Sequence, residues 1–199
     1  SVKWYGRNDW AAGYTTHLDV CEIDGQAIVL QHNNNNGVWH FGKYDGRGSV
    51  SWYTKNSWQA KTTTHMLFFR HQGKGVVLKH NAASGHWWFG DYDNSGSVKW
   101  YGRNDWAAGY TTHLDVCEID GQAIVLQHNN NNGVWHFGKY DGRGSVSWYT
   151  KNSWQAKTTT HMLFFRHQGK GVVLKHNAAS GHWWFGDYDN SGSVKWYGR

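Results

Sequence analysis

The chain has 199 residues, a formal net charge of +6, no proline and 15 tryptophans. It has no apolar run of the roughly 18 residues that a membrane-spanning helix needs. We also see no signal segment at its start, in which basic residues would precede an apolar stretch, so we expect a soluble protein. The basic residues are scattered singly instead of forming the patch typical of nucleic-acid binders, which disfavours a nucleic-acid partner. The compartment stays open, and secretion is compatible with the sequence.

Two levels of repetition organise the chain. Residues 97–199 repeat residues 1–103 without a change, and the heptapeptide SVKWYGR therefore occurs three times. Such an exact copy indicates either a very recent duplication or a deliberate joining of two units. Within the unit, residues 1–48 and 49–96 align without a gap at about 22 identical positions of 48. Fixed periods of 20 to 50 residues are typical of solenoids, propellers and arrays of like modules.

Each repeat contains four predicted strands and no predicted helix. In the first repeat, Thr16–Ile23 is rich in β-forming residues, and the Asp-Gly pair that follows suits a two-residue hairpin turn. The second strand reads QAIVLQHN. Leu18 and Val20 alternate on one face of the first strand, as Ile28 and Leu30 do on the second. We therefore expect all four side chains to lie in the core.

A polar loop, Asn33–Gly37, leads to the third predicted strand, VWHFGKYD. Asparagine tolerates left-handed backbone conformations, so we interpret this loop as a turn. Trp39 and Phe41 share one face of the third strand. A second tight turn starts at Asp45 and leads to the fourth strand, SVSWYT, after which an N-x-W-x-A link enters the next repeat.

Four short antiparallel strands, repeated head to tail, are typical of β-propeller blades, so we predict an all-β, β-propeller-like protein. A β-barrel, a β-prism or a trefoil-like assembly of the same hairpins stays open, although a trefoil would need three units. The predicted divisions are an N-terminal strand at 1–7 and repeats at 8–55, 56–103, 104–151 and 152–199, with residues 1–96 and 97–192 as identical units.

The N-terminal strand duplicates the fourth strand of a repeat, which is also the segment at 193–199. An unpaired strand edge is a template for another chain. We therefore predict a homo-oligomer or a strand-exchanged assembly, and we expect deletion of residues 1–7 to change the assembly state.

Both types of repeat share polar and aromatic residues that core packing does not require. Sugars combine hydroxyl groups with an apolar C–H face, so a tryptophan ring can stack on them while His, Asn and Asp bind the hydroxyls. Each residue also has a structural interpretation, since the Trp could fill space between repeats and the Asp could satisfy its own turn. The predicted ligand-binding residues are Trp10, His17, His32, Asn33, Asp45, Trp58, His65, His80, Asn81, Asp93, Trp106, His113, His128, Asn129, Asp141, Trp154, His161, His176, Asn177 and Asp189.

Metal binding and catalysis are less well supported. The 14 histidines are widely spaced and no cysteine pair accompanies them, so we expect no metal site and no cofactor. Cys21 and Cys117 lie in strand-like runs and are expected to be free thiols. Hydrolysis of a glycoside needs two facing carboxylates, whereas Glu22 and Glu118 are the only glutamates and occur in one repeat type. We therefore expect a protein that is not an enzyme.

The 48-residue period, the frame from Leu18 to Phe41 and the density of tryptophan resemble the tandem-repeat lectins, especially the small β-propeller lectins of bacteria and fungi. In those lectins, units of about this length each supply a four-stranded blade, and Trp-bearing sugar sites lie between or within blades. The resemblance implies a multivalent carbohydrate-binding protein with glycans or glycoconjugates as partners. Two alternatives are a structural or engineered self-assembling repeat protein without a specific small ligand, and a binder of single-stranded nucleic acid.

Overall fold

The computed structural model of the chain describes every residue except 6, 8, 10, 11, 198 and 199, and the side chains of residues 54 and 150. Its described residues form strands, turns and loops, with no helix that could span a membrane. Four antiparallel sheets follow one another along the chain, and we call them blades 1 to 4.

The strands of each blade are adjacent in chain order. Blade 1 contains β1 (His17–Ile23), β2 (Gln26–Asn33), β3 (Val38–Tyr44) and β4 (Val50–Ser57). Blade 2 contains β5 (His65–His71), β6 (Lys74–Asn81), β7 (His86–Tyr92) and β8 (Val98–Trp100), and the short β9 (Asn104–Asp105) also pairs with β7. Blade 3 contains β10 (His113–Ile119), β11 (Gln122–Asn129), β12 (Val134–Tyr140) and β13 (Val146–Ser153). Blade 4 contains β14 (His161–His167), β15 (Lys170–Asn177), β16 (His182–Tyr188) and β17 (Val194–Trp196).

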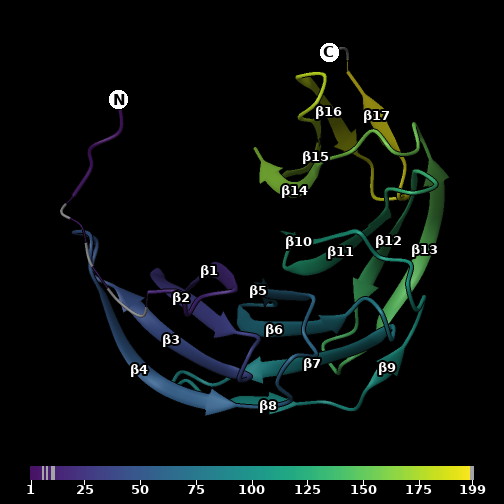
Figure 1. Cartoon of the computed structure of the whole chain (residues 1–199). Coiled ribbons are helices and arrows are strands. Elements are labelled where there is room, and N and C mark those ends of the chain that lie inside the picture. The colour runs from purple at the N-terminus through teal and green to yellow at the C-terminus, as the bar shows by residue number, and fades with distance from the viewer. Residues whose placement is uncertain (6, 8, 10–11, 198–199) are drawn as a thin grey trace.

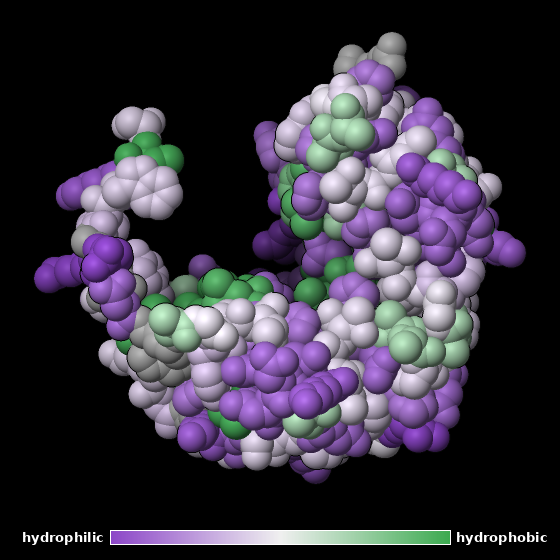
Figure 2. Space-filling model, in the orientation of Figure 1, coloured by the Kyte–Doolittle hydropathy of each residue, from purple (hydrophilic) through white to green (hydrophobic). Residues whose placement is uncertain are grey.

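The four sheets form a four-bladed β-propeller, which confirms the predicted fold class (Figure 1). The first strands of the blades, β1, β5, β10 and β14, lie towards the centre, and the fourth strands lie at the rim. Inner strands of consecutive blades contact one another. Blades 1 and 4 are the two ends of an arc, and open space lies between them (Figure 1 and Figure 2).

The predicted hairpin between the first two strands is confirmed. β1 and β2 pair from His17 opposite His32 to Ile23 opposite Gln26, so the connection has two residues. Both have positive φ, 50° at Asp24 and 76° at Gly25. A two-residue turn with this backbone twist matches the twist of the strands that it joins.

The core lies between blades and not only within them. Phe41 of blade 1 meets Phe68 and Tyr92 of blade 2, with ring centroids 5.3 and 4.7 Å apart. Ile28 and Leu30 are buried in the same cluster, as predicted. Similar clusters lie between blades 2 and 3 and between blades 3 and 4. Each blade is therefore stabilised mainly through its neighbours.

The predicted burial of Leu18 and Val20 is wrong, since these side chains are 65% and 53% exposed. Leu114, the same position in blade 3, is 7% exposed because blade 2 covers it. Among the described residues, no blade lies on that side of blade 1. The hydrophobic pattern of the strand identifies a face to be covered, but the position of the blade in the arc determines whether it is covered.

Gly138 allows the fourth strand of blade 3 to approach the third. A Cβ atom at this position would overlap Val146 Cγ1 and lie 2.8 Å from Trp148 Cε3. We expect Gly138→Ala to lower the free energy of unfolding by about 1–3 kcal/mol, because a packed core resists added volume. Gly102→Ala is the matched control, since nothing lies within 4 Å of its Cβ position. Urea denaturation of both variants checks this, and equal stabilities would contradict it.

Candidate functional site

The predicted histidines come together as pairs on the inner two strands of each blade. His17 Nδ1 lies 3.0 Å from His32 Nδ1, and His17 Nε2 donates to Thr64 O of the next blade at 3.0 Å. In this neutral tautomer His17 Nδ1 accepts the proton of His32. The pairs of blades 1 to 3 thus connect consecutive blades. The equivalent pairs are His65 with His80, His113 with His128, and His161 with His176.

One member of each pair is deeply buried in blades 1 to 3. His32, His80 and His128 are at most 1% exposed. Burial, together with the neighbouring histidine, lowers the pKa of His32 to about 4 and those of His80 and His128 to about 3. These rings are therefore neutral at pH 7, and a ligand would have to displace protein atoms to reach them.

The predicted asparagines and aspartates hold turns. Asn33 Oδ1 accepts a hydrogen bond from Asn35 N at 2.9 Å. Asp45 Oδ1 accepts from Ser49 N at 2.9 Å and from Arg47 N at 2.7 Å, and these bonds lower the pKa of the Asp45 carboxyl group. Equivalent bonds occur at Asn81, Asp93, Asn129, Asp141, Asn177 and Asp189. Their predicted contact with a ligand stays a prediction.

The predicted tryptophans lie at the junctions between blades, except for Trp10, which is outside the described residues. Each described junction gathers three indoles. One comes from the third strand of a blade, one from the link that leaves that blade, and one from the outer strand of the next blade. The sets are Trp39, Trp58 and Trp100; Trp87, Trp106 and Trp148; and Trp135, Trp154 and Trp196.

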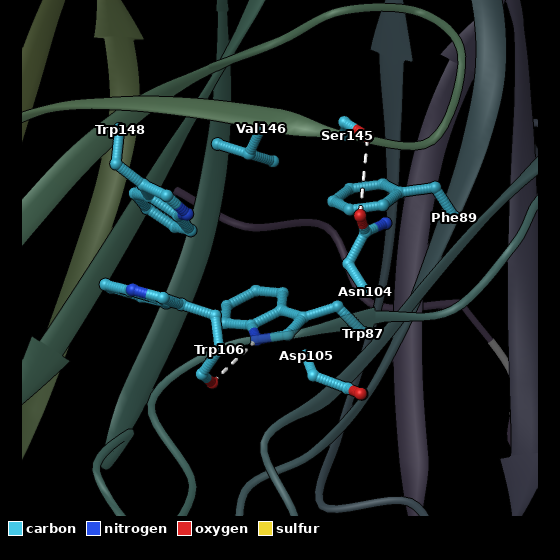
Figure 3. A pocket seen from close by; sticks show the side chains of 8 residues that line it. All are labelled: Trp87, Phe89, Asn104, Asp105, Trp106, Ser145, Val146 and Trp148. Atoms are coloured by element: carbon cyan, nitrogen blue, oxygen red, sulfur yellow. Dashed lines mark hydrogen bonds between the residues drawn. The ribbon is translucent and has the colours of Figure 1, made fainter.

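The junction between blades 2 and 3 contains a pocket of about 200 Å³ (Figure 3). The indoles of Trp106 and Trp148 are stacked at one side, with centroids 4.3 Å apart. Asn104 and Ser145 lie at the other side, joined by a hydrogen bond of 3.4 Å, and Trp87 Nε1 donates to Trp106 O at 3.2 Å. The pocket lies below the range of roughly 300–1,000 Å³ of drug-sized sites, so it suits a single small ring.

The corresponding positions line a second pocket, of about 410 Å³, between blades 3 and 4. Its lining residues are Trp135, Asn152, Ser153, Trp154, Ser193, Val194 and Trp196. An asparagine donates across every described junction to the turn of the next blade: Asn56 to Gly96 O, Asn104 to Gly144 O and Asn152 to Gly192 O. The turn that Asp141 holds therefore borders the pocket beside Trp106.

Several indole N–H groups at these junctions are donors without a protein acceptor. Trp39, Trp135 and Trp196 each have a buried Nε1 with no hydrogen-bond partner among the described residues. Two of them, Trp135 and Trp196, line the pocket between blades 3 and 4. A buried donor without an acceptor costs free energy, which a hydroxyl oxygen would recover once it displaced a neighbouring side chain. The junctions can thus offer aromatic faces and directed donors together.

A buried lysine, which no sequence pattern indicated, distinguishes two of the three described junctions. Lys79 is 1% exposed, and its Nζ lies 5.1 and 4.4 Å from the ring centroids of Trp58 and Trp88. Nζ also donates to Thr62 Oγ1 at 2.9 Å. Burial lowers the pKa of Lys79 to about 8. Lys175 repeats the arrangement with Trp154 and Trp184.

Charged residues also line a central cavity of about 420 Å³, to which all four inner strands contribute. Burial raises the pKa of Asp115 to about 6. Its two carboxylate oxygens accept hydrogen bonds from Val116 N and from Phe164 N of the next blade, both at 2.8 Å. Asp19 does the same with Phe68 N. No sequence pattern indicated these aspartates, which connect an inner strand to the next blade.

The fold and the junction pockets define the class: a four-bladed β-propeller with a repeated aromatic pocket between its blades. No protein-family model matches the sequence, and no similarity to a curated protein was found. The fold resembles solved carbohydrate-active enzymes and a lactonase. The chain spans about half the length of the first of these structures.

Three solved structures illustrate the likeness. An exo-β-1,3-galactanase from Phanerochaete chrysosporium, solved with galactose, is 11% identical with a TM-score of 0.68, over 92% of this chain and 49% of that one. A GH43_1 enzyme from Xanthomonas citri, complexed with xylotriose, is 10% identical with a TM-score of 0.61, over 93% and 73%. A periplasmic gluconolactonase from Pseudomonas aeruginosa is 16% identical with a TM-score of 0.57, over 86% and 50%. At these identities the likeness shows the fold alone.

Proposed function

We propose that the chain is a multivalent carbohydrate-binding protein, a lectin, whose sites are the pockets between its blades. The observation that carries the proposal is the recurrence of three indoles and one asparagine at each described junction. At the junctions of blade 1 with blade 2 and of blade 3 with blade 4, buried indole donors also have no acceptor among the described residues. An aromatic face suits the C–H face of a sugar ring, and the donors suit its hydroxyl groups. Solved neighbours of the fold hold galactose and xylotriose.

Repetition favours binding over catalysis. An enzyme concentrates its chemistry in one unique site, whereas these residues recur from junction to junction. The carboxyl group of Asp115, whose pKa burial raises to about 6, already accepts backbone hydrogen bonds at both oxygens. Several weak sites on one rigid body can raise avidity by roughly 10² to 10⁴ for a ligand that reaches more than one of them. We therefore propose binding without hydrolysis.

A glycan array followed by isothermal titration tests the function, and the double variant Trp39→Phe/Trp135→Phe tests the sites. This change removes two buried N–H donors but keeps aromatic rings. We expect the dissociation constant at those junctions to rise about tenfold, as the loss of one hydrogen bond of about 1.4 kcal/mol implies. Trp4→Phe is the control, because Trp4 is exposed and outside the pockets. Unchanged affinity in the double variant would exclude the junction sites.

A structural repeat protein without a specific small ligand is the second candidate. The observation that favours it is the dense packing of the same indoles against one another, such as Trp106 on Trp148. It predicts that no sugar binds at millimolar concentration and that loss of a junction tryptophan lowers only the melting temperature.

A further inference from the structure

We propose that the two ends of the arc are docking surfaces for further copies of the same chain. Blade 4 of one copy would pack on blade 1 of the next, in the geometry of the junction between blades 2 and 3. This inference does not depend on the proposed function, because it rests on the packing of the blades alone.

The exact repeat supplies the first argument. Blade 4 has the sequence of blade 2, and blade 1 has the sequence of blade 3. The face that blade 2 presents to blade 3 is buried: Trp87 is 2% and Phe89 is 1% exposed. The same face of blade 4 is open, with Trp183 50% and Phe185 45% exposed. Leu163 and Phe165 extend this apolar surface.

The opposite end of the arc carries the complementary surface. Leu18 and Val20 are exposed on blade 1, while their copies Leu114 and Val116 pack against blade 2. Figure 2 shows hydrophobic surface on both sides of the open space between the two ends. The chain therefore carries both halves of an interface that it already forms once internally.

Charges at the two ends match in the same way. At the internal junction Arg70 Nε donates to Glu118 Oε2 at 2.8 Å, and Arg70 Nη2 donates to Glu118 Oε1 at 2.9 Å. The copies of these residues are Arg166 on blade 4 and Glu22 on blade 1, and both are exposed. No ion pair between them occurs among the described residues. Docking would place the guanidinium on the carboxylate.

Backbone groups complete the match. At the internal junction the Gln72 amide donates to Gly121 O at 2.7 Å, and His71 Nδ1 accepts from Ala123 N at 3.2 Å. The corresponding groups on blade 4 belong to His167 and Gln168, which are exposed. Their acceptor and donor on blade 1 would be the carbonyl oxygen at position 25 and the amide at position 27.

The N-terminal segment lies where an outer strand of a preceding blade would lie. A Cβ atom on Gly48 would meet Tyr5, as one on Gly144 would meet Tyr101 at the end of blade 2. In a docked pair, Tyr5 of one copy and Tyr197 of the other would compete for one position, because both heptapeptides are identical. Docking thus displaces one of the two segments and leaves the other as the outer strand.

A second copy, and not the same chain, is the expected occupant, because blades 1 and 4 of one chain lie apart (Figure 1). A head-to-tail contact closes into a ring if its rotation allows and otherwise continues as a filament. The measured mass is therefore expected to be a multiple of 22.9 kDa.

Light scattering coupled to size exclusion, over a hundredfold range of protein concentration, tests the proposal. We expect Arg166→Glu and Glu22→Arg, each at an exposed residue, to raise the apparent dissociation constant of assembly at least tenfold. The double variant Arg166→Glu/Glu22→Arg restores the pair with reversed charges and is expected to assemble as the wild type does. Lys99→Glu changes the charge equally on an exposed strand position outside the interface and is the control.

A wild-type chain that stays monomeric at every concentration would overturn the proposal. Assembly that both single variants leave unchanged would overturn it too, since the chains would then associate through another surface. Thermal melting of each variant establishes that the fold is retained. Sugar titration of the monomeric single variants separates this inference from the proposed function, because the internal junction pockets are intact in them.

Discussion

Acidification from pH 7.5 to pH 5 is expected to destabilise the fold by about 4.5 kcal/mol and to lower Tm by about 10 °C. The cause is the burial of His32, His80 and His128, whose pKa values fall to between about 3 and 4. An unfolded histidine binds its proton near pH 6.5, so the unfolded state gains protons first. The stability from these rings is complete above pH 6.5 and is lost as the pH falls through that value towards 4.

Buried aspartate acts in the opposite direction. The pKa of Asp115 rises to about 6, so the folded state takes up that proton first and gains stability as the pH falls from 6 to 3.8. At pH 5 this amounts to about 1.4 kcal/mol, against about 2 kcal/mol lost for each of the three histidines. The histidines therefore decide the sign of the effect.

Differential scanning calorimetry between pH 7.5 and pH 5 checks the expectation. His128→Gln removes one buried imidazole, so it should melt lower at pH 7.5 but lose less stability on acidification. Asn131→Ala, in the exposed loop beyond β11, changes no titratable group and is the control, so it should keep the wild-type slope. A Tm that is flat from pH 7.5 to pH 5 would contradict the burial of the three rings.

Phe89→Ala is expected to lower the free energy of unfolding by about 3–5 kcal/mol, because Phe89 is 1% exposed and stacks on Tyr140 with centroids 4.6 Å apart. Phe185 occupies the same position in blade 4, but no further blade among the described residues covers it, and it is 45% exposed. Phe185→Ala should therefore cost less than half as much when the chain is monomeric. Denaturant titration of both variants compares the same position in a covered and in an open blade. Equal losses in the free energy of unfolding would contradict the open arc.

Much of the fold follows from local sequence. The 48-residue period, the two-residue turn at Asp24 and the alternation of Ile28 and Leu30 were sufficient to predict four-stranded repeats, which the structure confirms. The extent of the arc did not follow. Leu18 and Leu114 have identical neighbours in sequence but opposite exposure, since burial here depends on which blade stands beside the strand.

Some residues of the junction pockets could be selected from the sequence. The link tryptophans Trp58, Trp106 and Trp154 do lie at the junctions, where an aromatic residue outside a strand has space to fill. Their partners, such as Trp39 and Trp100, have the sequence pattern of ordinary core residues. A strand pattern shows which face of a strand is apolar, but it does not show that two blades bury that face between them. The histidines were selected for their recurrence. Their recurrence reflects the bonds that join one blade to the next.

The burial of charged side chains could not be predicted from the sequence for a physical reason. Lys79 lies at a strand position where the other repeat type has Gln31. The neighbouring sequence does not distinguish a lysine that extends its ammonium group to solvent from one that lies between two indoles. Asp115 likewise follows an apolar residue in a strand of mixed polarity. Only the approach of the next blade, which supplies Phe164 N, gives the carboxylate its role.

Isothermal titration of the chain with the best sugar from a glycan array tests the central claim most directly. Sites at the junctions predict at least two equivalents of sugar per chain. They also predict that Asn104→Ala binds one equivalent less, because this change removes the amide between Trp106 and the turn of blade 3. Asn131→Ala, in the loop beyond β11, is the control and should keep the wild-type stoichiometry. Absence of binding to any sugar at millimolar concentration, or a stoichiometry that Asn104→Ala leaves unchanged, would contradict it.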